Sequence, residues 1–156
     1  MRIVIMLVAS IFLLFANVSA AEASVSNPES LNGEWVGTWT SLNSPTYNGV
    51  VQMSINQEGD NVFGTSVLGN TKCSPERVFK GNLSGKYKNF IELELAPEQN
   101  PTNPISKNWG VITRSRNAIS AVYNFENPTS ACYGDVGTMF ISKIQPYSKI
   151  EGITKK

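Results

Sequence analysis

Residues 51–56 read Val-Gln-Met-Ser-Ile-Asn and alternate strictly between apolar and polar side chains. Successive side chains of a β-strand point to opposite faces, so the pattern predicts a strand with Val51, Met53 and Ile55 in a core and the polar residues in water. Residues 91–95, Ile-Glu-Leu-Glu-Leu, repeat the alternation. The chain is therefore predicted to consist of strands that each have one buried face.

Short runs of this kind, rich in β-branched and aromatic residues, recur between Gly, Asn, Ser and Pro clusters, and no stretch keeps a helical period. Strands with one buried face can remove their exposed edges by closing on themselves. We predict an all-β fold, an eight-stranded antiparallel up-and-down barrel, with a two-sheet β-sandwich as the alternative. The eight strands are expected at residues 34–41, 49–57, 61–68, 77–84, 90–96, 109–114, 118–125 and 137–144.

The connections between these strands fall into two classes. The second, fourth and sixth are short and rich in turn residues, whereas the other four are longer and hold most of the prolines. Alternate connections of an up-and-down barrel lie at the same end. One end should therefore be closed by tight turns while the other carries four long loops, at residues 42–48, 69–76, 97–108 and 126–136.

The N-terminus has the three zones of a secretory signal peptide. Arg2 precedes an apolar run at residues 3–16, and small residues lead to Ala20. The run is shorter than the roughly 20 residues that a membrane-spanning helix needs, and no membrane span is predicted elsewhere. We expect a secreted or periplasmic protein. Its predicted parts are a signal peptide (1–20), an N-terminal segment (21–32), the barrel domain (33–145) and a polar C-terminal tail (146–156).

Two cysteines, Cys73 and Cys132, are an even number in a chain expected to reach an oxidising compartment. They fall in the second and fourth long loops, which the barrel topology places at the same end. We predict that they form a disulfide across the mouth of the barrel.

Charge and composition exclude several functions. Loss of Arg2 with the signal peptide leaves 12 basic residues (13 less 1) against 12 acidic ones, so the mature domain is neutral and lacks the basic footprint of a nucleic-acid binder. The chain has no histidine, which removes the commonest general base and metal ligand. No metal site and no cofactor is predicted.

The acidic residues offer no catalytic pair either. Glu92 and Glu94 oppose the apolar face of their strand and should point to solvent. Asp135 follows Gly134 in a long loop and is interpreted as a turn residue. With both cysteines paired, no base and nucleophile remain, so we predict that the protein is not an enzyme.

The segment Gly33-Glu34-Trp35 opens the first strand with a Gly-x-Trp motif. It resembles the calycin barrels, the lipocalin and avidin-like families, in which this Trp packs at the closed end of the barrel. The resemblance implies an eight-stranded barrel whose ligand cup opens at the long loops. Lipocalins place an Arg late in the barrel against this Trp, and Lys143 is the nearest candidate here.

Aromatic residues are the remaining candidates for a binding site, because rings in a dry cup hold small apolar or sugar-like molecules. By strand direction, Trp39, Tyr47, Trp109 and Tyr133 lie nearest the open end. We expect a non-enzymatic barrel that binds a small, partly apolar ligand in its cup. The alternative is a protein-binding barrel, such as an inhibitor of a secreted hydrolase, that acts through its long loops. An open cavity of roughly 300 Å³ or more would favour the first.

Overall fold

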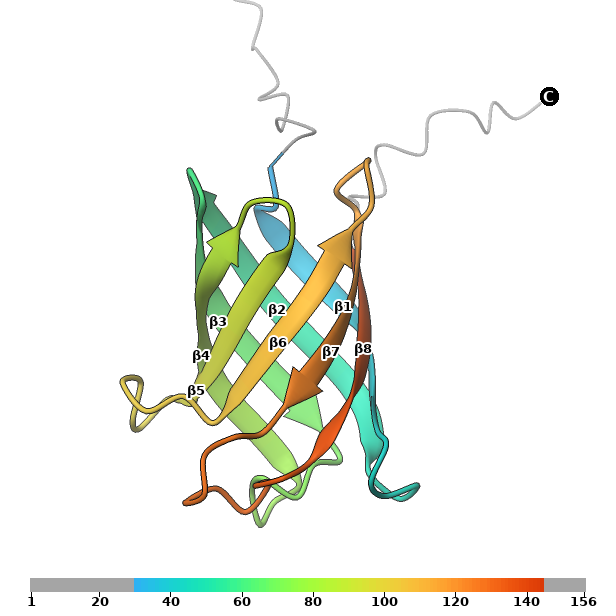
Figure 1. Ribbon diagram of the computed structural model, residues 1–156, viewed down its shortest axis with the longest axis vertical. Helices are drawn as coiled ribbons and strands as arrows, with labels where there is room; N and C mark the ends of the chain where they lie inside the picture. Colours follow the sequence, from blue (N-terminus) through green and yellow to red (C-terminus); the bar gives the residue numbers. More distant parts are fainter. Residues whose placement is uncertain (1–29, 145–156) are drawn as a thin grey trace, which may run out of the picture.

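The computed structural model describes residues 30–144, which form eight strands and no helix (Figure 1). The predicted signal peptide, most of the N-terminal segment and the C-terminal tail lie outside the described residues. The strands are β1 (Gly33–Ser41), β2 (Asn48–Glu58), β3 (Asn61–Gly69), β4 (Val78–Tyr87), β5 (Ile91–Pro97), β6 (Ser106–Ile112), β7 (Ala118–Asn124) and β8 (Val136–Lys143).

Each strand pairs antiparallel with its neighbours in sequence, and β1 also pairs with β8 to close the barrel. The closing ladder runs from the Trp35–Lys143 pair to the Ser41–Gly137 pair. The predicted closed up-and-down barrel is confirmed, and the sandwich alternative is excluded. Every predicted strand exists, but β6 begins at Ser106 rather than at residue 109. The prediction missed this beginning because two polar residues of β6 point into the barrel, where apolar residues are usual.

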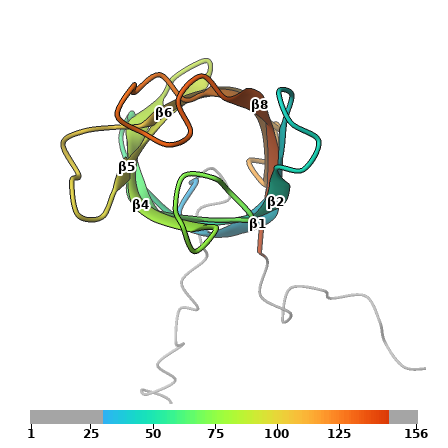
Figure 2. The ribbon, with the colours of Figure 1, turned by 90° about the horizontal axis from the view of Figure 1, so that it is seen from below.

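The two ends of the barrel differ as the connection lengths predicted (Figure 1). At the turn end, Gly59 and Arg116 have left-handed backbone conformations, with φ of 59° and 51°, in the β2–β3 and β6–β7 turns. At the loop end lie the long β1–β2, β3–β4, β5–β6 and β7–β8 connections. Seen from this end, the β3–β4 and β7–β8 loops cross the mouth, while the other two lie outside its rim (Figure 2).

The turn half of the interior is packed with apolar side chains. Trp35 is 1% exposed, and its indole N–H donates to the Leu31 carbonyl at 2.9 Å. The Lys143 ammonium lies 6.0 Å from the centre of the Trp35 ring and donates to the Ser30 carbonyl at 2.9 Å. The buried side chains around them are Leu31, Met53, Ile55, Val62, Leu83, Ile91, Leu93, Ile119 and Ile141.

The architecture is therefore calycin-like: a closed barrel of eight sequential antiparallel strands. Trp35 closes the turn end, as the Gly-x-Trp resemblance implied, and a cation late in the barrel lies over its ring. The strand phases read from the alternation of residues 51–56 and 91–95 are also correct, because their apolar members are buried.

Candidate functional site at the loop end

The buried polar side chains of the barrel lie from its middle to the loop end. Burying a polar group is costly unless it finds a hydrogen-bond partner, so a one-sided distribution requires a local explanation. Within residues 30–144 the buried polar and charged residues are Ser41, Ser66, Thr71, Ser106, Asn108 and Asp135.

Two large rings fill the interior just below the mouth. Trp39 and Tyr123 meet edge to face, with ring centres 6.1 Å apart, and the Trp39 N–H donates to the Gly69 carbonyl at 3.0 Å. Each ring lies beside a glycine on the neighbouring strand: Trp39 pairs with Gly49 and Tyr123 with Gly137. A Cβ at residue 137 would lie 2.4 Å from the Tyr123 hydroxyl, so glycine makes room for the ring.

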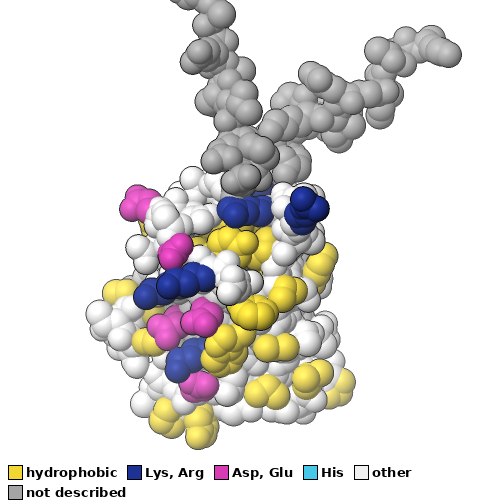
Figure 3. All heavy atoms as spheres, turned by 45° about the horizontal axis from the view of Figure 1, so that its top comes forward, with side chains coloured by type: hydrophobic (Ala, Val, Ile, Leu, Met, Phe, Trp, Pro, Cys, Tyr) yellow, Lys and Arg dark blue, Asp and Glu magenta, His cyan; other side chains and the backbone are white. Residues whose placement is uncertain are grey.

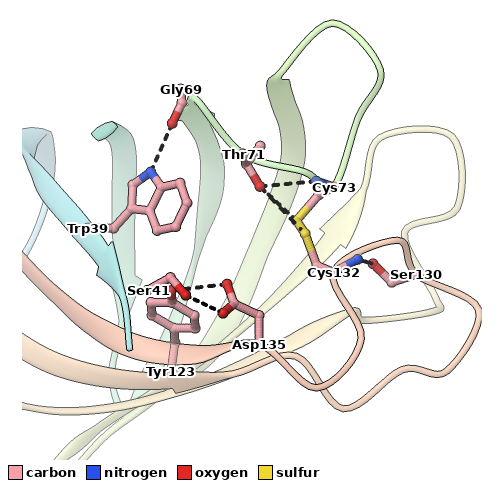
Figure 4. The surroundings of a disulfide bond; sticks show 9 residues. All are labelled: Trp39, Ser41, Gly69, Thr71, Cys73, Tyr123, Ser130, Cys132 and Asp135. Atoms are coloured by element: carbon pink, nitrogen blue, oxygen red, sulfur yellow. Dashed lines mark hydrogen bonds between the residues drawn. A yellow bond between two sulfur atoms is a disulfide. The ribbon is translucent and has the colours of Figure 1, made fainter. Parts of the chain in front are cut away.

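Asp135 is the one acidic residue that the described part of the chain buries, at 3% exposure. Its carboxyl group accepts hydrogen bonds from the Ser41 hydroxyl at 2.5 Å and the Tyr123 hydroxyl at 3.3 Å (Figure 4). Burial first, and then the charge and hydrogen bond of Asp135, raises the pKa of the Tyr123 phenol. The Ser41 hydroxyl accepts from the backbone N–H groups of Asn43 and Ser44, both at 3.1 Å, which fixes the start of the β1–β2 loop.

The predicted disulfide is present. Cys73 and Cys132 join the β3–β4 and β7–β8 loops, with their Cα atoms 4.8 Å apart. Thr71 lies beneath the bridge: its hydroxyl is 3.0 Å from the Cys73 sulfur and accepts from the Cys73 N–H at 3.1 Å (Figure 4). The two loops that cross the mouth are therefore covalently connected.

Asparagine side chains connect the remaining loops. The amide of Asn70 donates to the Thr46 carbonyl at 3.2 Å and to the Asn48 carbonyl at 2.7 Å. The amide of Asn43 donates to the Gly134 carbonyl at 2.8 Å. Asn127 donates to the Asn103 side chain at 2.8 Å. These contacts link the β1–β2 loop to the β3–β4 and β7–β8 loops, and the β7–β8 loop to the β5–β6 loop. Together with the disulfide they join all four loops into one cap.

The space inside the barrel is small. The cavity under the cap measures about 10 Å³ and is lined by residues that include Trp39, Thr71 and Asn108, which is room for about one water molecule. Outside the cap, a groove of about 1050 Å³ runs between the β3–β4, β5–β6 and β7–β8 loops, past Pro75, Glu98 and Thr129. The loop end therefore presents its open space on its outer surface.

Three of the four predicted site residues lie at the loop end. Trp39 is inside the barrel at 4% exposure. Tyr47 is half-buried in the β1–β2 loop, with the Arg77 guanidinium 5.8 Å from its ring centre. Tyr133 is exposed on the β7–β8 loop.

The interior placement expected for Trp109 was wrong. Trp109 is 39% exposed on the outer wall of β6, because the inward positions of this strand are Ser106, Asn108 and Gly110. Ser106 and Asn108 belong to the loop-end interior, and the sequence prediction missed them. The sequence contains a pattern that indicates this phase of the strand. Every second residue from Ser106 onward, namely Ser106, Asn108, Gly110 and Ile112, belongs to one face, and that face ends in an apolar residue.

The reading of Asp135 as an ordinary turn residue also needs correction, because its side chain is buried. Nothing in the local sequence reveals this, since its two partners lie on β1 and β7. Glu92 is exposed and Glu94 half-buried on the outer wall, as expected. Among residues 30–144 no group of three or more Cys, Asp or Glu side chains could hold a metal ion. The same residues contain no helix long and apolar enough to cross a membrane.

No family model matches the chain, and neither the curated proteins nor the solved structures contain a significant match.

Proposed function

We propose that this protein is an exported, non-enzymatic barrel that binds another protein through the outer surface of its loop end. The observation that carries the proposal is the cap. Four loops are connected by a disulfide and asparagine side chains over an interior with room for about one water molecule. Loops held in one arrangement lose little conformational entropy on binding, which favours a rigid recognition surface.

Export is supported by the predicted signal peptide and by the disulfide, which persists in oxidising compartments. A non-enzymatic role is supported by the lack of histidine and by the use of both cysteines in a bridge. The buried acid, Asp135, is held by two hydroxyl groups. This arrangement suits a structural role, because a nucleophile or general base needs access to a substrate.

We further propose kinship with the calycins, the lipocalin and avidin-like families. The support is local as well as architectural. Gly33 and Trp35 open the first strand. Lys143, the nearest candidate for the Arg that lipocalins place against this Trp, has its ammonium 6.0 Å from the centre of the Trp35 ring.

The test is a comparison of two matched charge reversals during purification from the native host. Glu98 is exposed in the loop-end groove, and Glu58 is exposed at the turn end. We expect a host protein to co-purify with the wild-type chain and with Glu58→Lys, and to fall at least tenfold with Glu98→Lys. A partner retained equally by both variants, or no protein partner, would overturn the proposal.

A second candidate function, binding of a small molecule in the cup, is favoured by one observation. The Ser66 hydroxyl is buried in the barrel with no hydrogen-bond partner in the described part of the chain, and Ser106 and Asn108 line the small cavity. A ligand with a hydrogen-bonding group would satisfy the Ser66 hydroxyl if the aromatic rings moved apart. Native mass spectrometry of the host-purified protein should then show a retained molecule that Asn108→Leu removes.

A further inference from the structure

The beginning of β4, Val78–Lys80, is paired with a neighbouring strand on one side only. On the β3 side it continues the ladder that ends at the Gly69–Val78 pair. On the other side the ladder between β4 and β5 ends at the Gly81–Pro97 pair, and no strand of the described residues continues it toward the loop end. Closing a barrel removes the exposed edges of its sheet, so this short open edge is an exception in the wall.

The edge is open because the chain leaves the sheet after Pro97. Proline has no backbone N–H to donate to a ladder. The Asn100 N–H donates to the Pro97 carbonyl at 3.0 Å, which begins a turn. Figure 2 shows the β5–β6 loop that follows outside the rim of the barrel. Consequently, β5 has no residue opposite Val78 or Lys80.

The backbone groups of Val78 and Lys80 point to the open side. Along a strand, the N–H and C=O groups of successive residues alternate between the two neighbouring strands. The Tyr87 N–H donates to the Asp60 carbonyl on the β3 side at 2.8 Å, and the register of β4 against β3 has no break. Every second residue from Tyr87, down to Phe79, therefore faces β3. Val78 and Lys80 each direct an N–H and a C=O toward the open edge.

The loop-end groove of about 1050 Å³ lies against this edge. Its lining includes Phe79 and Ile105, each 5% exposed, and Val78, which is 41% exposed. The charged residues of the lining are Glu76, Lys80 and Glu98. Apolar side chains beside an excess of acidic ones suit a bound segment that carries apolar and basic residues.

The wall closer to the turn end differs from this edge. There β4, β5 and β6 are paired, and opposite charges face each other across the strands: Lys86 lies opposite Glu92, and Glu94 lies opposite Lys107. Figure 3 shows charges of both signs gathered on one side of the wall. The unpaired backbone groups are therefore confined to the loop end, beside the groove.

We propose that the groove holds an extended segment of the partner protein, which adds to β4 as a strand beside Val78–Lys80. This inference rests on the protein-binding function proposed for the loop end and specifies what is bound there. Backbone hydrogen bonds supply the affinity of an added strand, and side-chain pockets beside it supply specificity. A helix bonds its own backbone groups internally, so it cannot pair with this edge. Because the edge is short, we expect a dissociation constant in the micromolar range.

The first measurement is amide hydrogen exchange in the free, mature, disulfide-bonded protein, resolved by residue with NMR. The amides of Val78 and Lys80 should exchange at least about tenfold faster than that of Phe79, which faces β3. Equal protection of the three amides would mean that the edge is closed, and would overturn the proposal.

The second measurement uses a phage library of random linear peptides of about ten residues, long enough to span the edge and the groove. The tightest peptide selected on the mature protein is synthesised, and its Kd is measured by fluorescence anisotropy. Two variants are compared with the wild type. Lys80→Thr removes the lysine side chain but keeps the N–H, whereas Lys80→Pro removes both and places a ring on the open side. We expect Lys80→Pro to weaken binding at least about tenfold more than Lys80→Thr does.

The substitution by proline leaves the β3–β4 ladder intact, because the Lys80 N–H faces away from β3, and urea unfolding midpoints check that both variants fold. A further readout needs no variant: the bound peptide should slow exchange of the Val78 and Lys80 amides in the wild type at least about tenfold. Equal weakening by both variants, unchanged exchange at Val78, or a selection that yields no peptide would each overturn the proposal.

Failure of the strand addition is distinguishable from failure of the proposed function. A host protein that is lost with Glu98→Lys, but is retained equally by Lys80→Pro and Lys80→Thr, leaves the protein-binding function in place and overturns only the added strand. The absence of any host partner overturns the protein-binding function itself.

Discussion

The two halves of this barrel fill the same cylinder in different ways. Around Trp35 the turn half is occupied by aliphatic and aromatic side chains, closed by tight turns, and its indole N–H is satisfied by a nearby backbone carbonyl. Around Trp39 the loop half mixes rings with buried hydroxyl, amide and carboxyl groups under a disulfide-bonded cap. The contrast separates the part that provides stability from the part that holds a surface in place.

Apolar packing stabilises in proportion to the area removed from water. Buried polar groups contribute little net stability even when satisfied, although losing a partner is costly. The polar contacts of the loop half therefore fix the positions of its loops but contribute less to the free energy of unfolding than apolar packing would. The following experiments test this division of roles, from the largest expected effect to the smallest.

Replacement of Trp35 by alanine should cause the largest loss, about 5 kcal/mol of unfolding free energy, because a fully enclosed aromatic leaves a cavity that its neighbours cannot fill. Trp39→Ala should cost less, about 3 kcal/mol, since the space beside it already accommodates about one water molecule. Trp109→Ala, on the outer wall, is the control and should cost under about 1 kcal/mol. Urea unfolding measures all three; equal losses for Trp35 and Trp39 would contradict the division.

Removal of the disulfide by the double substitution Cys73→Ala/Cys132→Ala should cost about 4 kcal/mol, the loop-closure entropy of a bridge spanning 59 residues. In the native state the change should be local. Hydrogen exchange is expected to accelerate in the β3–β4 and β7–β8 loops and to remain slow in the turn half. Uniform acceleration across both halves would show that the bridge supports the whole barrel rather than its cap.

Substitution of Asp135 by alanine should cost about 2 kcal/mol, because the Ser41 and Tyr123 hydroxyls lose a buried acceptor. Asp60→Ala removes an exposed acid at the turn end, paired with Lys88 at 3.8 Å, and should change stability by under about 0.5 kcal/mol. The urea unfolding midpoints of the two variants, each compared with the wild type, measure both losses of stability. A loss at Asp60 as large as that at Asp135 would remove the distinction between the two ends.

The smallest effect concerns alkaline pH. The pKa of Tyr123 is raised in the folded state by burial and by Asp135, so the unfolded chain releases this proton first. The stability that neutral Tyr123 contributes is complete below about pH 10, the ordinary pKa of tyrosine. Above that pH it should decline by up to about 1.4 kcal/mol per pH unit. Tyr123→Phe should remove this slope, whereas Tyr133→Phe, on the exposed loop, should retain it.

Much of the fold could be predicted because alternation records burial directly. Ile91, Leu93 and Leu95 could only point inward, and the closing of the barrel followed from the number of strands and the lengths of their connections. The disulfide was predictable once the topology placed Cys73 and Cys132 at one end. The error at Trp109 arose where β6 turns polar residues inward, which reverses the usual relation between polarity and exposure.

The sequence by itself determined the strands, the barrel, its two unlike ends and the pairing of its cysteines, because each depends on local periodicity, chain length and connection length. The tertiary structure alone decided that Asp135 is buried with Ser41 and Tyr123 and that the mouth is capped. These features join residues from distant strands. Their contacts are set by the register of the closed barrel, and no single segment contains that information.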